Sequence, residues 1–201
     1  MSEFNSLAFP SNNPFDLFDT WFAAATASET VDPNAMTVAT ATPDGRPAAR
    51  TLLLKGRDSR GFTFFTNTES RKGGELISNP HVALLFHWKS LARQVRIEGP
   101  VEQVTDAEAD AYYGSRARIS RLGAWASQQS RPLGSREQLE TGVAGFDAKF
   151  PEETIPRPPY WTGFRCLPAY FEFWQDRPFR LHDRITYTPE GTGWTLGRLY
   201  P

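Results

Sequence analysis

The amino-acid sequence predicts an α+β fold, in which a β-barrel is flanked by a few helices. Aromatic residues make up 13% of the 201 residues, a share that suits a β-rich core. About six or seven segments have the composition or alternation of strands, and segments of helical periodicity lie between them. Because no repeat or low-complexity tract interrupts this pattern, we expect a single domain over residues 14–201 and a flexible leader over residues 1–13.

The first element expected is a helix over residues 14–28. Asn13 can cap it, Pro14 suits its first turn, and Phe15, Phe18 and Phe22 fall on one face. Two strands within residues 36–56 follow, joined by the turn signal Pro43-Asp44-Gly45, and then a strand over residues 61–67. A short helix is expected between Thr68 and Pro80, because Thr68 or Ser70 can open it and Asn79-Pro80 can close it.

The second half of the chain continues this alternation. Strands are expected over residues 81–88 and 93–104, a helical segment begins at Thr105 within residues 105–130, and a helix covers residues 136–150. Residues 155–161 read as a proline-rich connector. Strands over residues 170–175 and 179–189 form a final hairpin around Asp176-Arg177-Pro178, and residues 193–201 end the chain.

The composition excludes several classes of function. The 22 Lys and Arg residues balance 23 Asp and Glu residues, so no global charge draws the chain to nucleic acid or to an anionic membrane. The single cysteine, Cys166, cannot form an intramolecular disulfide, and the three histidines lack structural-metal spacing. We expect no metal, no signal peptide and no membrane helix, and a reducing, cytoplasmic location.

Local clusters of cations point to anionic ligands. In residues 70–76, Arg71 and Lys72 stand at a helix N-terminus, where they oppose the helix dipole unless a phosphate lies between them and the helix. Gly73 and Gly74 would let the backbone approach such a phosphate, although a solvated surface turn explains the same residues. Residues 50–55, RTLLLK, place a cation at each end of a strand, which also suits an ordinary buried strand.

Two further clusters have the same character. If residues 180–184 form a strand, Arg180, His182 and Arg184 share one face with Trp174, where a flat anionic ring could stack. Tyr112, Arg116 and Ser120 are four residues apart and can line one helical face as a clamp for a phosphate. Solvated surface residues are the alternative for each cluster. Together, in a chain without net positive charge, they favour a small phosphorylated ligand.

Six motifs in order carry a family resemblance. They are RTLLLK at 50–55, FFTN at 64–67 with SRK at 70–72, RQVRIEG at 93–99, YYGSR at 112–116, GAWASQQS at 123–130, and FW at 173–174 with RLHDR at 180–184. From about Asp32 to Pro201 the chain resembles the pyridoxine/pyridoxamine 5′-phosphate oxidases. The resemblance implies an antiparallel, Greek-key-like FMN-binding split β-barrel. It also implies a homodimer that holds FMN at the subunit interface.

The resemblance also implies roles for individual residues. For FMN these are Arg50, Thr51, Leu52, Leu53, Leu54, Lys55, Phe65, Thr66, Arg71, Lys72, Gln94, Gln129, Ser130, Trp174 and Arg184. For the substrate they are Lys55, Tyr112, Arg116, Ser120, Arg180 and His182, with Arg180 and His182 as catalytic groups over the pyridine ring. Ala117, Ile119 and Phe65 depart from the usual family residues, which are Pro, Asp and Tyr.

The implied reaction is the oxidation of pyridoxine 5′-phosphate or pyridoxamine 5′-phosphate by O₂ to pyridoxal 5′-phosphate, with release of H₂O₂, in vitamin B6 synthesis and salvage. Two alternatives stay open. One is a flavin oxidase of the same fold acting on another substrate, of the phenazine-pathway type. The other is a non-catalytic protein that binds FMN or pyridoxal phosphate. The trio Tyr112, Arg116 and Ser120 favours a phosphorylated pyridine.

Overall fold

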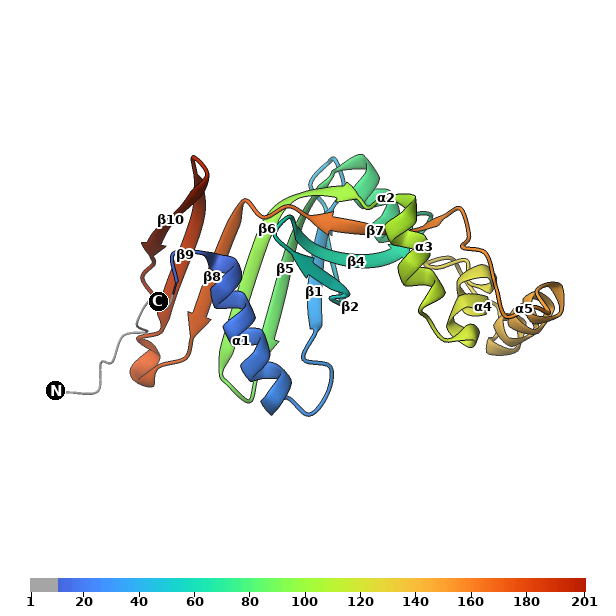
Figure 1. Cartoon of the computed structure of the whole chain (residues 1–201), viewed down its shortest axis with the longest axis horizontal. Helices are drawn as coiled ribbons and strands as arrows, with labels where there is room; N and C mark the ends of the chain where they lie inside the picture. Colours follow the sequence, from blue (N-terminus) through green and yellow to red (C-terminus); the bar gives the residue numbers. More distant parts are fainter. Residues whose placement is uncertain (1–10) are drawn as a thin grey trace.

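The computed structural model describes residues 11–201 and shows a curled antiparallel sheet with helices on one face and at one end (Figure 1). The predicted α+β split barrel is confirmed. The strands are β1 (Ala35–Ala41), β2 (Pro47–Leu53), β3 (Gly56–Asp58), β4 (Gly61–Asn67), β5 (His81–Trp88), β6 (Arg93–Gln103), β7 (Trp161–Cys166), β8 (Tyr170–Gln175), β9 (Asp183–Glu190) and β10 (Gly193–Arg198). The helices are α1 (Pro14–Ser28), α2 (Arg71–Ser78), α3 (Asp106–Gly114), α4 (Arg118–Ala126) and α5 (Arg136–Lys149), with a 3₁₀ turn at Pro178–Arg180.

Strand β6 divides the sheet into two parts. Its first half pairs with β8, from Arg93 opposite Gln175 to Glu98 opposite Tyr170. Its second half pairs with β7, where Val101 lies opposite Cys166. Along its other edge β6 pairs with β5, and the order β10-β9-β8-β6-β5-β1-β2 continues on both sides. The chain therefore splits into two sheets that share one long strand.

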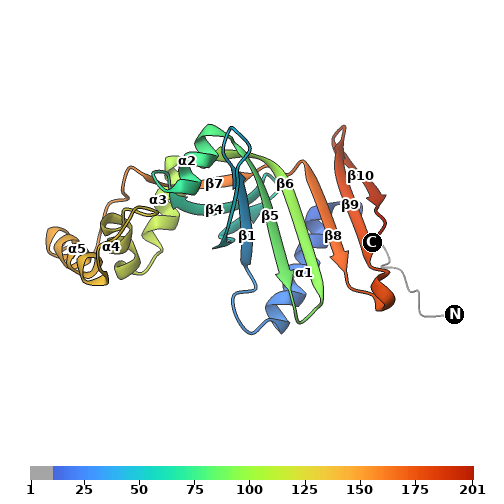
Figure 2. The ribbon, with the colours of Figure 1, turned by 180° about the vertical axis from the view of Figure 1, so that it is seen from behind.

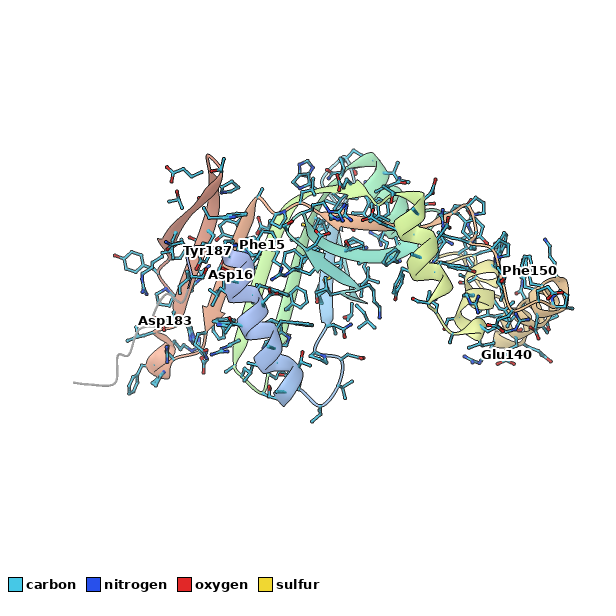
Figure 3. The ribbon with its side chains drawn as sticks, in the orientation of Figure 1. Phe15, Asp16, Glu140, Phe150, Asp183 and Tyr187 are labelled. Atoms are coloured by element: carbon cyan, nitrogen blue, oxygen red, sulfur yellow. The ribbon has the colours of Figure 1, made fainter. Side chains whose placement is uncertain are left out.

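Helix α1 covers one face of the sheet, as Figures 1 and 2 show from opposite sides. Asn13 caps it by accepting a hydrogen bond from the Phe15 N–H, and Pro14 stands in its first turn, as predicted. Phe15 points into the sheet, where its ring lies 5.4 Å from Phe171 and stacks on Phe62 at 5.7 Å (Figure 3). This aromatic contact anchors the helix to both parts of the split sheet.

Helices α4 and α5 project beyond the sheet at the end away from β10 (Figures 1 and 2). Residues 1–10 of the predicted leader lie outside the described residues. Next to them, the Ser11 carbonyl accepts a hydrogen bond from the Tyr187 hydroxyl. Within residues 11–201 no helix is long and apolar enough to cross a membrane.

Three strands were not predicted, namely β3, β7 and β10. The connector predicted over residues 155–161 ends where β7 begins at Trp161. All six residues of β7 are buried, so the segment lacks the alternation that marks a half-exposed strand. It also contains Gly163 and the buried Arg165, which forms ion pairs with Glu102 and Glu108. Such pairs with distant residues leave no signal in the local sequence.

Helix α2 lies unusually close to the loop before it. A Cβ atom on Gly73 would stand 2.4 Å from the carbonyl oxygens of Asn67 and Thr68, whereas one on Gly74 would meet nothing within 4 Å. Gly73 therefore serves the contact between the helix and its own preceding loop. This contact alone explains why residue 73 is a glycine, without the predicted approach of a phosphate to the backbone there.

These two neighbouring glycines give a matched pair of variants. We expect Gly73→Ala to lower the free energy of unfolding by about 2 kcal/mol, because the new methyl group overlaps two backbone carbonyls. Gly74→Ala should raise it by about 0.5–1 kcal/mol, because alanine favours the helix. Urea denaturation of both variants measures the difference. Equal effects of the two substitutions would contradict this account.

Candidate active site

One cleft of about 460 Å³ lies between the strands β2 and β4 and the helices α3 and α4. Its lining residues are Leu52, Leu53, Lys55, Phe65, Thr66, Asn67, Tyr112, Arg116, Ser120, Gly123, Ala124, Ser127, Gln129 and Trp161. Nine of these were predicted as cofactor or substrate residues, although they come from separate parts of the sequence. The fold therefore brings most of one predicted set to a single cavity.

Arg116 lines this cleft with an uncompensated guanidinium group. Burial lowers the pKa of its guanidinium group, and its Nη1 atom is buried without a hydrogen-bond partner. Among residues 11–201 no carboxylate pairs with it. A buried polar atom without a partner is costly unless a ligand supplies one, and a guanidinium group prefers an oxyanion. The cleft is thus built to receive an anionic group beside Arg116.

Tyr112 and Ser120 line the same cleft, but not from one helical face as predicted. Tyr112 belongs to α3, Ser120 to α4, and the chain turns at residues 115–117 between the two helices. The Ser115 N–H closes this turn by donating to the carbonyls of Ala111 and Tyr112. The single-helix geometry was therefore wrong, and the turn brings the three side chains to one cavity instead.

A second polar group stands at the N-terminus of α2. Lys72 is buried, and its Nζ donates hydrogen bonds to Gln129 Oε1 at 3.0 Å and to Thr66 Oγ1 at 3.2 Å. Burial, and then the charge of Arg50, lower the pKa of Lys72. A buried ammonium group held by neutral oxygens is ready to bind an anion, because nothing in its immediate contacts neutralises it.

Arg50 and Arg71 converge on Glu75 rather than on the cleft. Arg50 Nη2 lies 3.2 Å and Arg71 Nε 2.8 Å from the buried carboxylate, which also accepts a hydrogen bond from Thr40. Burial alone would raise the pKa of Glu75, but these three donors hold it below its ordinary value. Glu75 therefore fixes the two arginines in place, and 63% of the Arg71 side chain stays exposed.

The other predicted residues lie on a different part of the sheet. Gln94 faces Trp174 across β6 and β8, and both line a small hollow of about 170 Å³. Arg184 pairs with Trp174 in register across β8 and β9, and its Nε lies 2.6 Å from the buried Glu172. The hydrogen bond that Arg184 donates to the Glu172 carboxylate raises the pKa of Arg184. The hollow at Gln94 and Trp174 shares no lining residue with the cleft of Arg116, and β8 and β9 lie at the opposite end of the molecule from α3 and α4 (Figure 1).

Arg180 and His182 do not share a strand face with Arg184 as predicted, because β9 begins only at Asp183. Pro178 starts a 3₁₀ turn, and Phe179 and Arg180 have positive φ angles of 60° and 62°. Proline favours this turn and lacks the N–H that a continuing ladder needs. His182 still lies against Trp174, with ring centroids 4.6 Å apart, and its Nδ1 is 3.0 Å from Asp176.

The remaining predicted residues are spread more widely. Thr51 and Ser130 are exposed, and Ser130 has a φ of 73°, while Leu54 belongs to the core. Sequence reasoning missed Asn67, Gly123, Ala124, Ser127 and Trp161 as lining residues. The motif at 123–130 contains three of them and could have indicated them. Trp161 had no such signal, because the sequence places it at the end of the proline-rich connector.

Other chemistry has little support in the described residues. No group of three or more His, Cys, Asp or Glu side chains within residues 11–201 could hold a metal ion. Burial raises the pKa of the Cys166 thiol to about 12, so this cysteine is not a nucleophile at neutral pH.

Comparison with known proteins identifies the family. Residues 23–148 match the family model described as pyridoxamine 5'-phosphate oxidase. The chain belongs to the pyridoxamine 5′-phosphate oxidase family. Residues 161–201 match a second model, described as the pyridoxine 5'-phosphate oxidase C-terminal dimerisation region. Family members are FMN-dependent oxidoreductases of vitamin B6 metabolism, and the resemblance seen in the sequence is confirmed.

Individual relatives cover nearly the whole chain. A pyridoxine/pyridoxamine 5'-phosphate oxidase of Gluconobacter oxydans is 64% identical over 189 residues, which are 94% of each chain. One of Rhodospirillum rubrum is 60% identical over 194 residues, covering 94% of this chain and 96% of its own.

Two solved structures share the fold. PhzG from Burkholderia lata, solved with tetrahydrophenazine-1-carboxylic acid, has a TM-score of 0.90 and 33% identity, covering 96% of this chain and 95% of its own. An FMN-binding protein of Nostoc punctiforme has a TM-score of 0.75 and 19% identity, covering 98% of this chain and 100% of its own. The second likeness concerns the fold alone.

The ion pairs of Glu75 lead to a pH-dependent prediction. Glu75→Gln should lower the free energy of unfolding at pH 7 by about 2–3 kcal/mol, because it leaves the half-buried Arg50 without its partner charge. A lowered pKa contributes stability above the ordinary value of 4.5 that is lost as the pH falls. The difference between the two proteins should therefore shrink below pH 4.5 in urea titrations.

Glu69→Gln is the matched control, because Glu69 is exposed and lies 3.8 Å from the exposed Arg131. Its effect should stay within about 0.5 kcal/mol at every pH. A Glu75→Gln effect as small as that of the control would refute the anchoring role.

Proposed function

We propose that this chain oxidises pyridoxine 5′-phosphate and pyridoxamine 5′-phosphate to pyridoxal 5′-phosphate, using FMN and O₂ and releasing H₂O₂. The observation that carries the proposal is the unpaired guanidinium of Arg116 in a cleft with Lys55 and the hydroxyls of Tyr112 and Ser120. Two cations and two hydroxyls suit a phosphate dianion, which offers three acceptor oxygens. The names of the relatives at 60–64% identity support the same substrates.

The residues present fit FMN as the cofactor. The buried Lys72, with Thr66 and Gln129, offers a donor to a phosphate, and the fixed Arg50 and Arg71 add positive charge at the same helix end. Leu52, Leu53 and Phe65 supply apolar walls for a flat ring system. When bound, FMN supplies the redox chemistry, accepting a hydride from the substrate and passing the electrons to O₂.

The protein itself holds and orients the substrate. Arg116, Lys55, Tyr112 and Ser120 would bind its phosphate, which fixes the position of the pyridine ring. Arg180 and His182 would contact that ring, Arg180 as a charge and His182 as a hydrogen-bonding group backed by Asp176. In this role both residues act through position and electrostatics, since orientation alone accounts for a large part of such rate enhancements.

We propose a homodimer in which each site takes residues from both chains. Within one chain, none of Trp174, Arg180, His182 and Arg184 lines the cleft of Arg116. Strands β8 and β9 lie at the opposite end of the molecule from α3 and α4 (Figure 1). These four residues fall within residues 161–201, which match the dimerisation region. The same region exposes Phe179, Leu181 and Tyr200, and large exposed apolar side chains are typical of contact surfaces. A second copy would thus bring its Trp174 group against the cleft.

A second candidate is an oxidase of the same fold with another substrate, because PhzG shares the fold at a TM-score of 0.90. Its bound molecule, tetrahydrophenazine-1-carboxylic acid, carries a carboxylate and no phosphate. A protein that binds FMN or pyridoxal phosphate without turnover is a third. We favour the phosphate oxidase because of the phosphate-binding group around Arg116.

We further propose that residues 14–201 act as one domain in the cytoplasm.

The first test is an absorbance spectrum of the purified protein without oxygen. We expect a flavin spectrum that bleaches when pyridoxine 5′-phosphate is added, because the bound flavin takes up electrons from the substrate. Admitting air should restore the spectrum and release peroxide. Unphosphorylated pyridoxine at the same concentration is the control and should bleach the flavin far more slowly.

Other outcomes discriminate among the candidates. A flavin that stays oxidised with both phosphorylated substrates points to the oxidase with another substrate, or to a binding protein. A colourless protein that does not take up added FMN contradicts the whole proposal, beginning with the site around Lys72.

The phosphate site has its own test. Replacing Arg116 by Ala should raise the KM for pyridoxine 5′-phosphate by roughly tenfold or more, because a charge-assisted hydrogen bond to the phosphate is lost. FMN should remain bound at its normal ratio. Arg118→Ala is a matched control, because Arg118 pairs with Asp147 outside the cleft. An unchanged KM in the Arg116 variant would remove that residue from the site.

A further inference from the structure

Three nearly parallel aromatic rings cluster along one wall of the cleft. The ring centroid of Phe65 lies 4.1 Å from that of Tyr112 and 5.2 Å from that of Trp161, and the Tyr112 and Trp161 centroids are 6.1 Å apart. This aromatic cluster joins β4, α3 and β7, which are distant in sequence. It therefore fixes the relative positions of the strands and the helix that line the cleft.

Arg116 lies against this aromatic cluster. Its guanidinium carbon is 5.0 Å from the ring centroid of Trp161 and 5.9 Å from that of Tyr113. Both distances are within the range of a cation–π contact, and Trp has the strongest such attraction among the aromatic residues. Ring faces, and not carboxylates, are thus the contacts of this cation among the described residues.

This choice of contact has a consequence for anion binding. Other buried arginines are held by carboxylates, for example Arg165 by Glu102 and Glu108. A carboxylate would orient Arg116 equally well, but it would neutralise the charge and compete with a phosphate for the same N–H groups. A ring face orients the guanidinium group while leaving its charge and its in-plane donors for a ligand.

Trp161 is itself firmly held. Its backbone N–H donates to the Pro158 carbonyl at 3.0 Å, and its backbone carbonyl accepts from Arg157 Nη1 at 2.7 Å. Arg157 in turn pairs with Asp106 and Asp110 on α3. The Trp161 backbone is therefore tied to the helix that carries Tyr112, and only 7% of the residue is exposed.

We propose that Trp161 is a positioning residue for the substrate phosphate, because its ring face holds Arg116 in a binding orientation without neutralising it. This inference rests on the proposed function and adds to it a residue that does not contact the reacting atoms. This role predicts that replacing Trp161 weakens the binding of phosphorylated ligands, because Arg116 is then no longer held in its binding orientation.

The test compares Trp161→Leu with Trp161→Phe in the FMN-loaded enzyme. We expect Trp161→Leu to raise the KM for pyridoxine 5′-phosphate roughly tenfold, the effect of losing a desolvated cation–π contact. Its kcat should stay within about twofold, as expected for a group that acts on binding alone. Trp161→Phe keeps a ring face and should stay within about threefold of the parent KM. Equal KM values for the two variants would overturn the proposal.

A double-mutant cycle separates this role from a merely structural one. In the Arg116→Ala background, Trp161→Leu should change the affinity for pyridoxal 5′-phosphate by less than about twofold. The reason is that the guanidinium group on which Trp161 acts is absent from this background. Additive effects of the two substitutions would overturn the proposal. The affinity is measured in an equilibrium titration in which the absorbance of pyridoxal 5′-phosphate reports binding. Pyridoxal, which lacks the phosphate, is the control ligand.

Further controls keep the result decisive. If Trp161→Leu does not fold, Trp161→Met fills more of the space without a ring and takes its place in the cycle. If the parent enzyme binds pyridoxal 5′-phosphate but oxidises no phosphorylated pyridine, the proposed function fails while the binding cycle still decides the role of Trp161. A parent protein with equal affinity for pyridoxal and its phosphate would overturn the phosphate site and the role of Trp161 together.

Discussion

The fold depends on a close backbone contact at Gly99, where β6 changes partners. The N–H groups of Leu167 and Ala169 donate to the carbonyls of Pro100 and Glu98, so the segment between β7 and β8 crosses β6 at this point. A Cβ atom on Gly99 would lie 2.0 Å from the Leu167 carbonyl oxygen. Only glycine allows the crossing, and the crossing lets one strand serve two sheets. The split sheet then leaves β4 and β7 free to form a wall of the cleft.

The cations of this chain fall into two groups with different roles. Arg50, Arg165 and Arg184 are fixed by the buried or half-buried carboxylates of Glu75, Glu108 and Glu172, so they build structure. The buried Lys72 and the half-buried Arg116 have no carboxylate in direct hydrogen-bond contact, and burial lowers the pKa of each. A folded protein retains such uncompensated cations at a stability cost, which an anionic ligand can offset. The site is therefore marked by cations that lack a carboxylate partner, and not by positive charge alone.

Much of the architecture could be predicted from local patterns, because capping and periodicity act within a few residues. The capping of α1 by Asn13 and of α3 by Thr105 follows directly from the sequence. The buried strand β7 and the site residue Trp161 could not be found this way, since ion pairs and ring contacts with distant residues determine them. The strand geometry at Arg180 failed for a related reason, because two positive φ angles after Pro178 end the alternation. The six motifs indicated the family, yet which cations are paired became visible only in three dimensions.

The turn containing Phe179 and Arg180 connects the fold of one chain to its assembly. Non-glycine residues at positive φ cost on the order of 1 kcal/mol each, and they persist where their surroundings compensate. Within one chain little does so for Phe179, because 91% of this side chain is exposed. The turn also presents Arg180 beside His182 and lies in the segment that matches the dimerisation region. Contacts made by a second copy would compensate the strain and bury the phenyl ring. In the proposed homodimer, assembly and completion of the site would be one event, since the same turn would serve both.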